Sequence, residues 1–144
     1  IIDAEKGAVF NRMKSGTKTR ELFFEGNVSV TDAGFDLSSE KLTAYMSPFT
    51  NKGVIDKAVA VGDEDGKVQV QRRSVNGDVQ LGKAGKVTFI GDTEDMVLDD
   101  WPEIRLNEHS SIATRQDAQI ILKRDGSVVS RGVGTKIIRE KAEE

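Results

Sequence analysis

One stretch of the sequence has the spacing of a phosphate-binding loop. Gly77, Gly82 and Lys83 stand where such a loop places its two glycines and its lysine. Ala84, however, replaces the Ser or Thr whose hydroxyl would reach a magnesium ion. The alternation over residues 87–89 predicts a strand, so no helix N-terminus follows to hold a phosphate. The sequence therefore favours two hairpin turns here over a nucleotide site.

Acidic side chains suggest two further chemistries. Residues 63–66 begin like a calcium loop, which needs Gly at its sixth position and Glu at its twelfth. Val68 and Ser74 stand there instead, so a solvated turn is the better interpretation. Paired carboxylates can also hydrolyse glycosidic bonds when they are held at a suitable separation. The candidates share one short segment without a cluster of sugar-stacking aromatics, which favours a solvated loop: Asp92, Glu94, Asp95, Asp99 and Asp100.

Nucleophilic and metal chemistry lack their usual residues. The chain has no Cys, which removes thiolate catalysis, disulfides and Cys-ligated zinc. His109 is the only His, and its neighbours Glu108, Ser110 and Ser111 indicate a loop crest, not a catalytic triad. The sequence therefore predicts a protein that is not an enzyme and that has neither a cofactor nor a metal site.

Length and composition indicate one globular domain. The chain has 144 residues, of which 37% are hydrophobic, and a formal net charge of −3 with an isoelectric point near 5.3. A domain of this length buries about 68% of its unfolded surface. The negative charge argues against nucleic-acid binding, which usually needs a basic surface. No apolar run approaches the roughly 20 residues of a membrane-spanning helix.

Apolar and polar residues alternate along much of the chain, as in strands with one buried and one solvated face. Turn sequences such as Asn76-Gly77 and Asp125-Gly126 separate these runs. The predicted class is all-β and antiparallel, with room for a turn or two of helix over residues 93–99. The alternation assigns the following residues to the interior of two facing sheets: Leu22, Phe24, Val28, Val30, Phe35, Leu37, Leu42, Val59, Val61, Val68, Val70, Val79, Leu81, Val87, Phe89, Ile104, Leu106, Ile112, Ile120 and Leu122.

A repeat underlies this alternation. The sequence IDAEK at residues 2–6, followed by Phe10, matches LSSEK at residues 37–41, followed by Tyr45. Short segments that contain a glycine follow the copies of this motif further along the chain, at residues 24–27, 60–63, 89–92 and 130–133. Four such units predict stacked hairpins that form an elongated structure with two unpaired ends, not a closed barrel.

Two of these segments resemble the repeat of the LptA/OstA family. EGNVSV at residues 25–30 is similar to the family's G-N-V-x-V, and LSSEKLTAY at residues 37–45 is similar to its L-x-A-D/E-K-x-x-Y. The likeness spans most of residues 2–133, but Trp101-Pro102 replaces an expected Gly-Asn pair. It implies an open antiparallel β-jellyroll, a V-shaped stack of two sheets, over residues 2–135, with a charged C-terminal tail over residues 136–144.

The resemblance also implies a function. Members of the family form a bridge that carries lipopolysaccharide across the periplasm to the outer membrane and shields its lipid A acyl chains in an apolar groove. The expected partners are therefore lipopolysaccharide and other jellyroll proteins of the bridge, joined by edge-strand pairing, including head-to-tail copies of this chain. The expected location is the periplasm, either free or tethered to the inner or outer membrane by a segment outside this sequence. The residues expected to contact lipid are Leu22, Phe24, Val28, Val30, Phe35, Leu37, Phe89, Ile104 and Leu106.

Two other functions stay open at this point. The first is a structural module whose repeats stack into a scaffold around a closed, dry core. The second is a carbohydrate-binding β-solenoid, for which one Trp and one Tyr make a poor sugar platform. The chain begins Ile1-Ile2-Asp3, without a start Met or an apolar signal, as expected of a mature or trimmed fragment.

Overall fold

The computed structural model describes residues 2–4, 11–13, 20–32, 34–46, 55–64, 66–74, 77, 79–106, 109–113, 116–131 and 135–139. These residues form fourteen strands and the turns between them, with no helix in the described ranges. Each strand pairing is antiparallel. The strands are β1 (Ile2–Asp3), β2 (Asn11–Met13), β3 (Arg20–Thr31), β4 (Phe35–Met46), β5 (Ile55–Val61), β6 (Val68–Arg73), β7 (Val79–Ala84), β8 (Lys86–Ile90), β9 (Asp95–Asp99), β10 (Glu103–Leu106), β11 (His109–Ala113), β12 (Gln119–Leu122), β13 (Val128–Arg131) and β14 (Thr135–Arg139).

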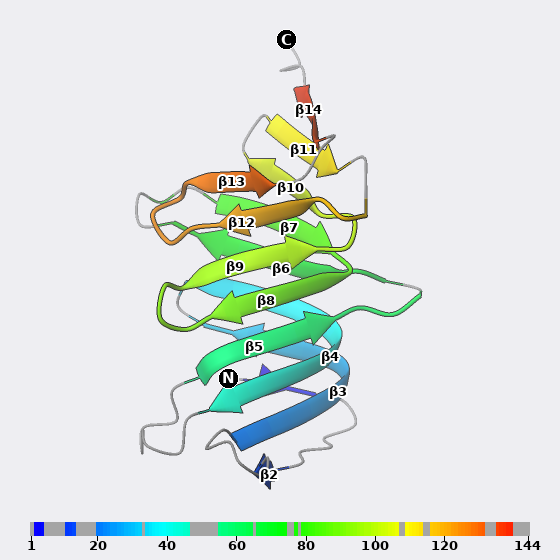
Figure 1. Cartoon of the computed structure of the whole chain (residues 1–144), viewed down its shortest axis with the longest axis vertical. Coiled ribbons are helices and arrows are strands. Elements are labelled where there is room, and N and C mark those ends of the chain that lie inside the picture. The colour runs from blue at the N-terminus through cyan, green and yellow to red at the C-terminus, as the bar shows by residue number, and fades with distance from the viewer. Residues whose placement is uncertain are drawn as a thin grey trace.

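The strands form two facing sheets that are joined through β4. The first half of β4 pairs with β6 and its second half pairs with β5, while β3 runs along the other side of β4. The front sheet continues as β5-β8-β9-β12-β13, and the back sheet continues as β6-β7-β10-β11-β14. Figure 1 shows the front sheet stacked along the long axis, with β6, β7 and β10 behind it. The molecule is therefore an elongated sandwich whose strands lie across its length.

One edge of the sandwich is the line where the chain crosses between the sheets, here called the crossing edge. The chain crosses at Gly26-Asn27 within β3, between β5 and β6, at Gly85 and at residues 100–102. Hydrogen bonds from Gly62 N–H to Gly85 O (3.0 Å) and from Gly85 N–H to Asp100 O (2.8 Å) connect successive crossings. The second of these contacts requires glycine, because a Cβ at residue 85 would overlap the Asp100 carboxylate. The crossing edge thus closes one side of the sandwich with backbone hydrogen bonds.

Two crossings share an unusual backbone conformation. Gly26 and Asn27 have φ values of 85° and 42°, and Asp100 and Trp101 have φ values of 65° and 57°. At the first crossing, β3 carries an extra residue between Glu25 and Val28, which is a β-bulge. Asp100-Trp101 therefore takes the backbone shape of the Gly-Asn motif without its sequence. This explains how the repeat continues where the sequence departs from the family pattern.

The opposite side, here called the hairpin edge, is where hairpin turns from the two sheets meet. The connections between β3 and β4 and between β6 and β7 belong to the back sheet, and turns at residues 91–94 and 123–127 belong to the front sheet. No chain crosses between the sheets at these turns. Only side chains can therefore close the sandwich there.

The interior differs from the simple alternation on two strands. Val61, Val79 and Leu81 were predicted to face inward, but they are exposed by 40%, 38% and 44%. On β7, Gly82 faces inward instead, because Leu98 of the front sheet packs directly against its backbone, with Cδ2 only 2.8 Å from where a Cβ would lie. On β5, the inward residues are Ala58 and Ala60, which pair with Phe89 and Val87 of β8, while Val59 lies on the outer face with Val61. The small residues leave space for large neighbours, so residue size reverses the predicted faces on these strands.

Two further expectations concern local structure. Residues 95–99 form β9 and not a helical turn, because Met96 and Leu98 are buried while Asp95 and Asp99 lie on the other face. Residues 135–139 form β14, which pairs with β11, so part of the segment assigned to a charged tail extends the back sheet. Residues 140–144, Asp65, Asn76 and residues 132–134 lie outside the described residues, as do the side chains of His109 and Ile112.

Candidate functional site

The residues predicted to contact lipid lie on the inner faces of the two sheets. Val28, Leu37 and Ile104 are buried in the core, and Leu22 is half-buried on β3. The β-bulge keeps Phe24 and Val28 on the inner face, because they are four residues apart on β3 while their partners Leu42 and Ser39, both buried, are only three apart on β4. The remaining members of the set are half-buried and pack against the core: Phe24, Val30, Phe35, Phe89 and Leu106.

Four of these residues line one apolar cavity at the hairpin edge, here called the chamber: Val30, Phe35, Leu37 and Phe89. Its volume is about 320 Å³, and its rim includes Asp32, Gly91 and Glu94 from the turns of the two sheets. Phe35 comes from the half of β4 that joins the back sheet, and Phe89 comes from β8 of the front sheet. Their ring centroids are 5.2 Å apart, so this aromatic pair bridges the sheets.

Sequence reasoning missed part of the chamber wall. Ile2, Ile55, Ala58 and Ala60 also line it, together with Leu42, which was assigned to the core but not to the site. The alanines were missed because the valines beside them looked like the inward residues. The signal that identifies them is cross-strand pairing, since Ala58 lies opposite Phe89 and leaves room for its ring. The chamber wall is therefore mostly apolar, with polar side chains contributed by Thr31, Asp32 and Glu94.

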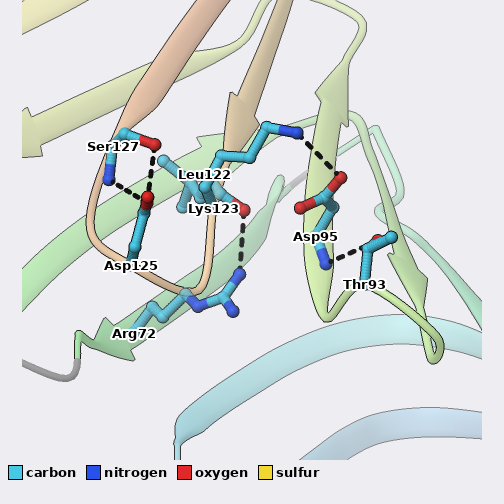
Figure 2. Close-up of polar contacts among 7 residues, drawn as sticks. All are labelled: Arg72, Thr93, Asp95, Leu122, Lys123, Asp125 and Ser127. Carbon is cyan, nitrogen blue, oxygen red and sulfur yellow. Dashed lines mark hydrogen bonds and ion pairs between the residues drawn. The ribbon is translucent and has the colours of Figure 1, made fainter.

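Further along the hairpin edge, two polar side chains join the sheets. Arg72 is 5% exposed, and its Nη1 donates a hydrogen bond of 2.8 Å to Leu122 O (Figure 2). Gln80 is 2% exposed, and its Nε2 donates a hydrogen bond of 2.7 Å to Gly126 O. Arg72 and Gln80 are neighbours in register on β6 and β7, and both acceptors belong to the β12–β13 hairpin of the front sheet. We call this pair the crossbar.

The crossbar is electrostatically costly. Burial lowers the pKa of Arg72, and the carboxylates of Glu94 and Asp95 oppose this shift. The Oε1 atom of Gln80 is buried and has no hydrogen-bond partner among the described residues. A buried acceptor left unpaired costs about 1–3 kcal/mol. The crossbar therefore buries polar groups at positions where an apolar pair would avoid this desolvation penalty.

The hairpin that supplies the two acceptors is itself held in place by polar contacts. Asp125 accepts hydrogen bonds from Ser127 Oγ (2.6 Å) and from Ser127 N–H (2.9 Å), which hold the pKa of its carboxyl below the ordinary value. Lys123 forms an ion pair of 3.2 Å with Asp95 of β9. Figure 2 shows these contacts on either side of the Arg72 guanidinium. The turn at residues 123–127 is thus fixed above the crossbar.

The residues considered for catalysis are placed in structural roles. Gly82 and Lys83 lie within β7, and the strand β8 follows them. Asp63 N–H donates a hydrogen bond to Gly66 O in the turn between β5 and β6. Four carboxylates of the acidic stretch bind neighbouring side chains: Glu94 binds Arg124, Asp95 binds Lys123, Asp99 binds Gln119 and Asp100 binds Gln116. Within the described ranges, no group of three or more His, Cys, Asp or Glu residues is arranged to hold a metal ion.

A second cavity, of about 500 Å³, lies on the outer face of the back sheet. Acidic, basic and amide side chains line it, including Asp36, Gln71, Lys83 and Arg105. Apolar residues such as Leu81 also line it. No helix among the described residues has the length and apolarity to cross a membrane.

Comparison with known proteins identifies the fold. No protein-family model matches the chain, and no curated protein matches its sequence. The structure is similar to the crystal structure of LptH from Pseudomonas aeruginosa, the LptA homologous periplasmic component of the conserved lipopolysaccharide transport device. The TM-score is 0.70 at 12% sequence identity, and the match covers 98% of this chain and 94% of that chain. The predicted fold class, an open antiparallel β-jellyroll of the LptA type, is confirmed.

Proposed function

We propose that this domain is a non-enzymatic carrier that shields the acyl chains of lipopolysaccharide as they cross the periplasm. The observation that carries the proposal is the chamber, an apolar cavity that opens between the sheets beside the Phe35–Phe89 pair. The same fold in a periplasmic component of a lipopolysaccharide transport device supports this choice of ligand and location. The chamber needs no catalytic residue, because its role is to replace water around hydrocarbon.

The energetics of hydrocarbon in water make such a chamber useful. Burying one methylene contributes about 0.8 kcal/mol, so an acyl chain of roughly 12 carbons costs on the order of 10 kcal/mol when exposed. Contacts with walls such as Val30, Leu37 and Leu42 recover this free energy without a preferred direction. A lipid held in this way can slide, because no fixed hydrogen bond must break as it moves. An apolar wall is therefore suited to transport as well as to binding.

The two ends of the sandwich suit the proposed partners. The strands β13 and β14 are the last strands of the front and back sheets at one end of the sandwich, and β1 and β2 pair with β3 at the other end (Figure 1). Unpaired strand edges bind extended segments by adding a strand to the sheet. Another jellyroll domain, or a second copy of this chain, would continue the sandwich in this way. Edge pairing of this kind would line up successive chambers.

Site-specific photo-crosslinking tests the proposal. A photo-reactive amino acid at Phe35 or Phe89, both in the chamber wall, is expected to capture lipopolysaccharide on illumination. The matched controls are Thr88 and Val61, which lie on the outer face of β8 and β5 and are expected to capture little. Equal capture at all four positions would contradict the assignment of the lipid to the chamber.

A fluorescent fatty-acid probe separates this function from a scaffold. A carrier binds the probe saturably, and lipopolysaccharide displaces it. Phe89→Ala removes half of the aromatic pair and should weaken probe binding by about tenfold, as expected for losing roughly 1–2 kcal/mol of apolar contact. Absence of saturable binding to the folded wild-type domain would favour a closed structural module.

A further inference from the structure

The cavity of about 500 Å³ on the outer face of the back sheet is a groove over four neighbouring strands, here called the outer groove. Its floor is backbone, because the buried residues along its centre face the core and pair in register across β4, β6, β7 and β10: Leu37, Val70, Gly82 and Ile104. Figure 1 shows that the strands lie across the long axis of the molecule. A groove that crosses them therefore runs along the length of the sandwich.

Two rows of outward-facing residues form the walls of the outer groove. The row nearer the crossing edge consists, in register, of Ser38, Gln69, Lys83 and Glu103. The row nearer the hairpin edge consists, in register, of Asp36, Gln71, Leu81 and Arg105. The walls are therefore polar except at Leu81, an apolar side chain that is 44% exposed.

Both carboxylates of the outer groove are neutralised by neighbouring cations. Asp36 forms an ion pair of 3.2 Å with Arg73, and Glu103 forms one of 3.2 Å with Lys67. Three polar side chains between them make no side-chain hydrogen bond or ion pair among the described residues: Gln69, Gln71 and Lys83. An amide both donates and accepts hydrogen bonds, and an ammonium donates three. These groups match a ligand rich in hydroxyls, each of which also donates and accepts.

The outer groove and the chamber share the strand β4. Phe35 lines the chamber on the inner face, and the next residue, Asp36, lines the outer groove. Arg73 connects the two sites, since its Nη1 pairs with Asp36 and its Nη2 donates a hydrogen bond of 2.9 Å to the backbone oxygen of Asp32, on the chamber rim. A molecule that leaves the chamber at the hairpin edge and passes round the end of β4 therefore reaches the outer groove.

We infer that the outer groove binds the saccharide portion of the lipid whose acyl chains occupy the chamber. The chains lie between the sheets, and the saccharide emerges past Asp32 and lies along the polar outer face. Leu81 contacts the apolar face of a sugar ring, while the amides of Gln69 and Gln71 bind its hydroxyls. This inference rests on the proposed function, because both sites hold parts of one lipid.

The composition of the outer groove agrees with a moving ligand. No aromatic side chain is among the residues that line it, so sugars are held by hydrogen bonds that exchange with water. The groove also runs along the length of the sandwich, across the strands. The saccharide can therefore advance outside the domain as the acyl chains slide within it.

A pair of affinity measurements separates the outer groove from the chamber. Gln71→Ala/Lys83→Ala should weaken the binding of lipopolysaccharide by about tenfold, as expected for losing about two hydrogen bonds to the saccharide. The same variant should leave the affinity for a fluorescent fatty-acid probe unchanged, because a fatty acid carries no saccharide. The matched control is Gln119→Ala/Lys86→Ala, which makes the same two substitutions on the outer face of the front sheet and should affect neither ligand.

Site-specific photo-crosslinking locates the saccharide directly. A photo-reactive amino acid at Gln71 should capture lipopolysaccharide but not a fatty acid, whereas one at Phe35 should capture both. Deacylated lipopolysaccharide keeps the saccharide but has nothing to fill the chamber. It should therefore be captured at Gln71 far less than the intact lipid.

The outcomes separate the two proposals. Capture of lipopolysaccharide at Phe35 but not at Gln71 would overturn the inference and leave the proposed function intact. An unchanged affinity of Gln71→Ala/Lys83→Ala for lipopolysaccharide would do the same. Equal capture of intact and deacylated lipopolysaccharide at Gln71 would overturn the link between groove and chamber. Failure of both lipopolysaccharide and the fatty acid to bind the folded wild type would overturn the proposed function and this inference together.

Discussion

Along the hairpin edge, the two sheets meet differently in two stretches. Near the N-terminal end, Phe35 and Phe89 meet across the sheets, and their half-buried rings border a cavity. Further along, Arg72 and Gln80 hold the β12–β13 hairpin directly against the back sheet. The backbone is alike in both regions, since all these residues belong to inner faces of antiparallel strands. The two regions therefore differ in their side chains and in whether a hairpin of the front sheet reaches them.

The interiors behind these two stretches differ accordingly. Met96, Leu98, Ile120 and Leu122, behind the crossbar, are completely buried and form an ordinary close-packed core. The chamber wall instead keeps half-buried residues such as Val30 and Phe89 around a cavity. One sandwich thus combines a filled region, which stabilises the fold, with an unfilled region, which is available to a ligand.

Truncating one large apolar side chain in each region gives the largest expected difference. Leu98→Ala should lower the free energy of unfolding by about 2–5 kcal/mol, because it leaves a cavity in a close-packed core. Phe89→Ala should cost less, because its ring already borders open space in the chamber. Urea denaturation followed by tryptophan fluorescence measures both losses. An equal or larger loss for Phe89→Ala would show that the chamber is packed like the core.

Adding a methyl group tests the filled region from the opposite direction. Gly82→Ala places a Cβ 2.8 Å from Leu98 Cδ2, and overpacking of this kind costs about 1–3 kcal/mol. Gly34→Ala is the matched control on the back sheet, since no atom lies within 4 Å of its added Cβ, and its effect should stay within about 0.5 kcal/mol. Thermal or urea unfolding compares the two variants.

The cause of the Gly82 effect can be isolated with a double mutant. In the Leu98→Ala background the new methyl has room, so adding Gly82→Ala should cost almost nothing or restore part of the loss. An undiminished cost in that background would show that backbone strain, not the Leu98 contact, requires glycine at this position.

The sequence predicted the architecture well because its signals are local. Two-residue alternation and turn dipeptides indicated antiparallel hairpins, and all pairings are antiparallel. The Gly26-Asn27 motif marked a real crossing between sheets. Gly91, however, lies in a hairpin turn, while the equivalent crossing uses Asp100-Trp101. A backbone conformation can be kept after its sequence motif is lost, and sequence inspection then misses it.

The faces of individual strands were harder to predict. Val79 and Leu81 look like core residues, yet the inward positions of β7 are Gln80, Gly82 and Ala84. The deciding contacts come from Leu98, which is far along the chain and belongs to the other sheet. The crossbar was missed for the same reason. The alternation from Val68 and Val70 places Arg72 on the inner face of β6 and Arg73 on the outer face. It does not show that Arg72 finds a buried partner, which only the approach of the β12–β13 hairpin supplies.

The neighbouring arginines give a smaller test of the comparison. Arg73 forms an ion pair of 3.2 Å with Asp36, and both side chains are substantially exposed. Arg73 Nη2 also donates a hydrogen bond of 2.9 Å to Asp32 O. Exposed ion pairs contribute about 0.2–1 kcal/mol and a hydrogen bond a similar amount, so Arg73→Gln should cost about 2 kcal/mol at most. The loss should shrink at high salt, because screening weakens the pair. Urea midpoints at low and high ionic strength give the measurement. A loss of several kcal/mol would mean that Arg73, not Arg72, holds this part of the edge closed.

The smallest expected effect concerns the turn that carries the crossbar acceptors. Ser127→Ala removes the hydroxyl that contributes most to the lowered pKa of Asp125, so that pKa should rise towards the ordinary aspartate value. A carboxyl with a lowered pKa stabilises the folded state above the unfolded-state pKa, and this contribution is lost as the pH falls through the folded-state pKa. As the pH is lowered, protonation of Asp125 should therefore reduce the free energy of unfolding less in the variant than in the wild type. Carboxyl chemical shifts of Asp125 against pH measure the change directly. An unchanged titration would mean that Ser127 does not hold the turn through Asp125. The position of Gly126 O, which accepts from Gln80, would then need another cause.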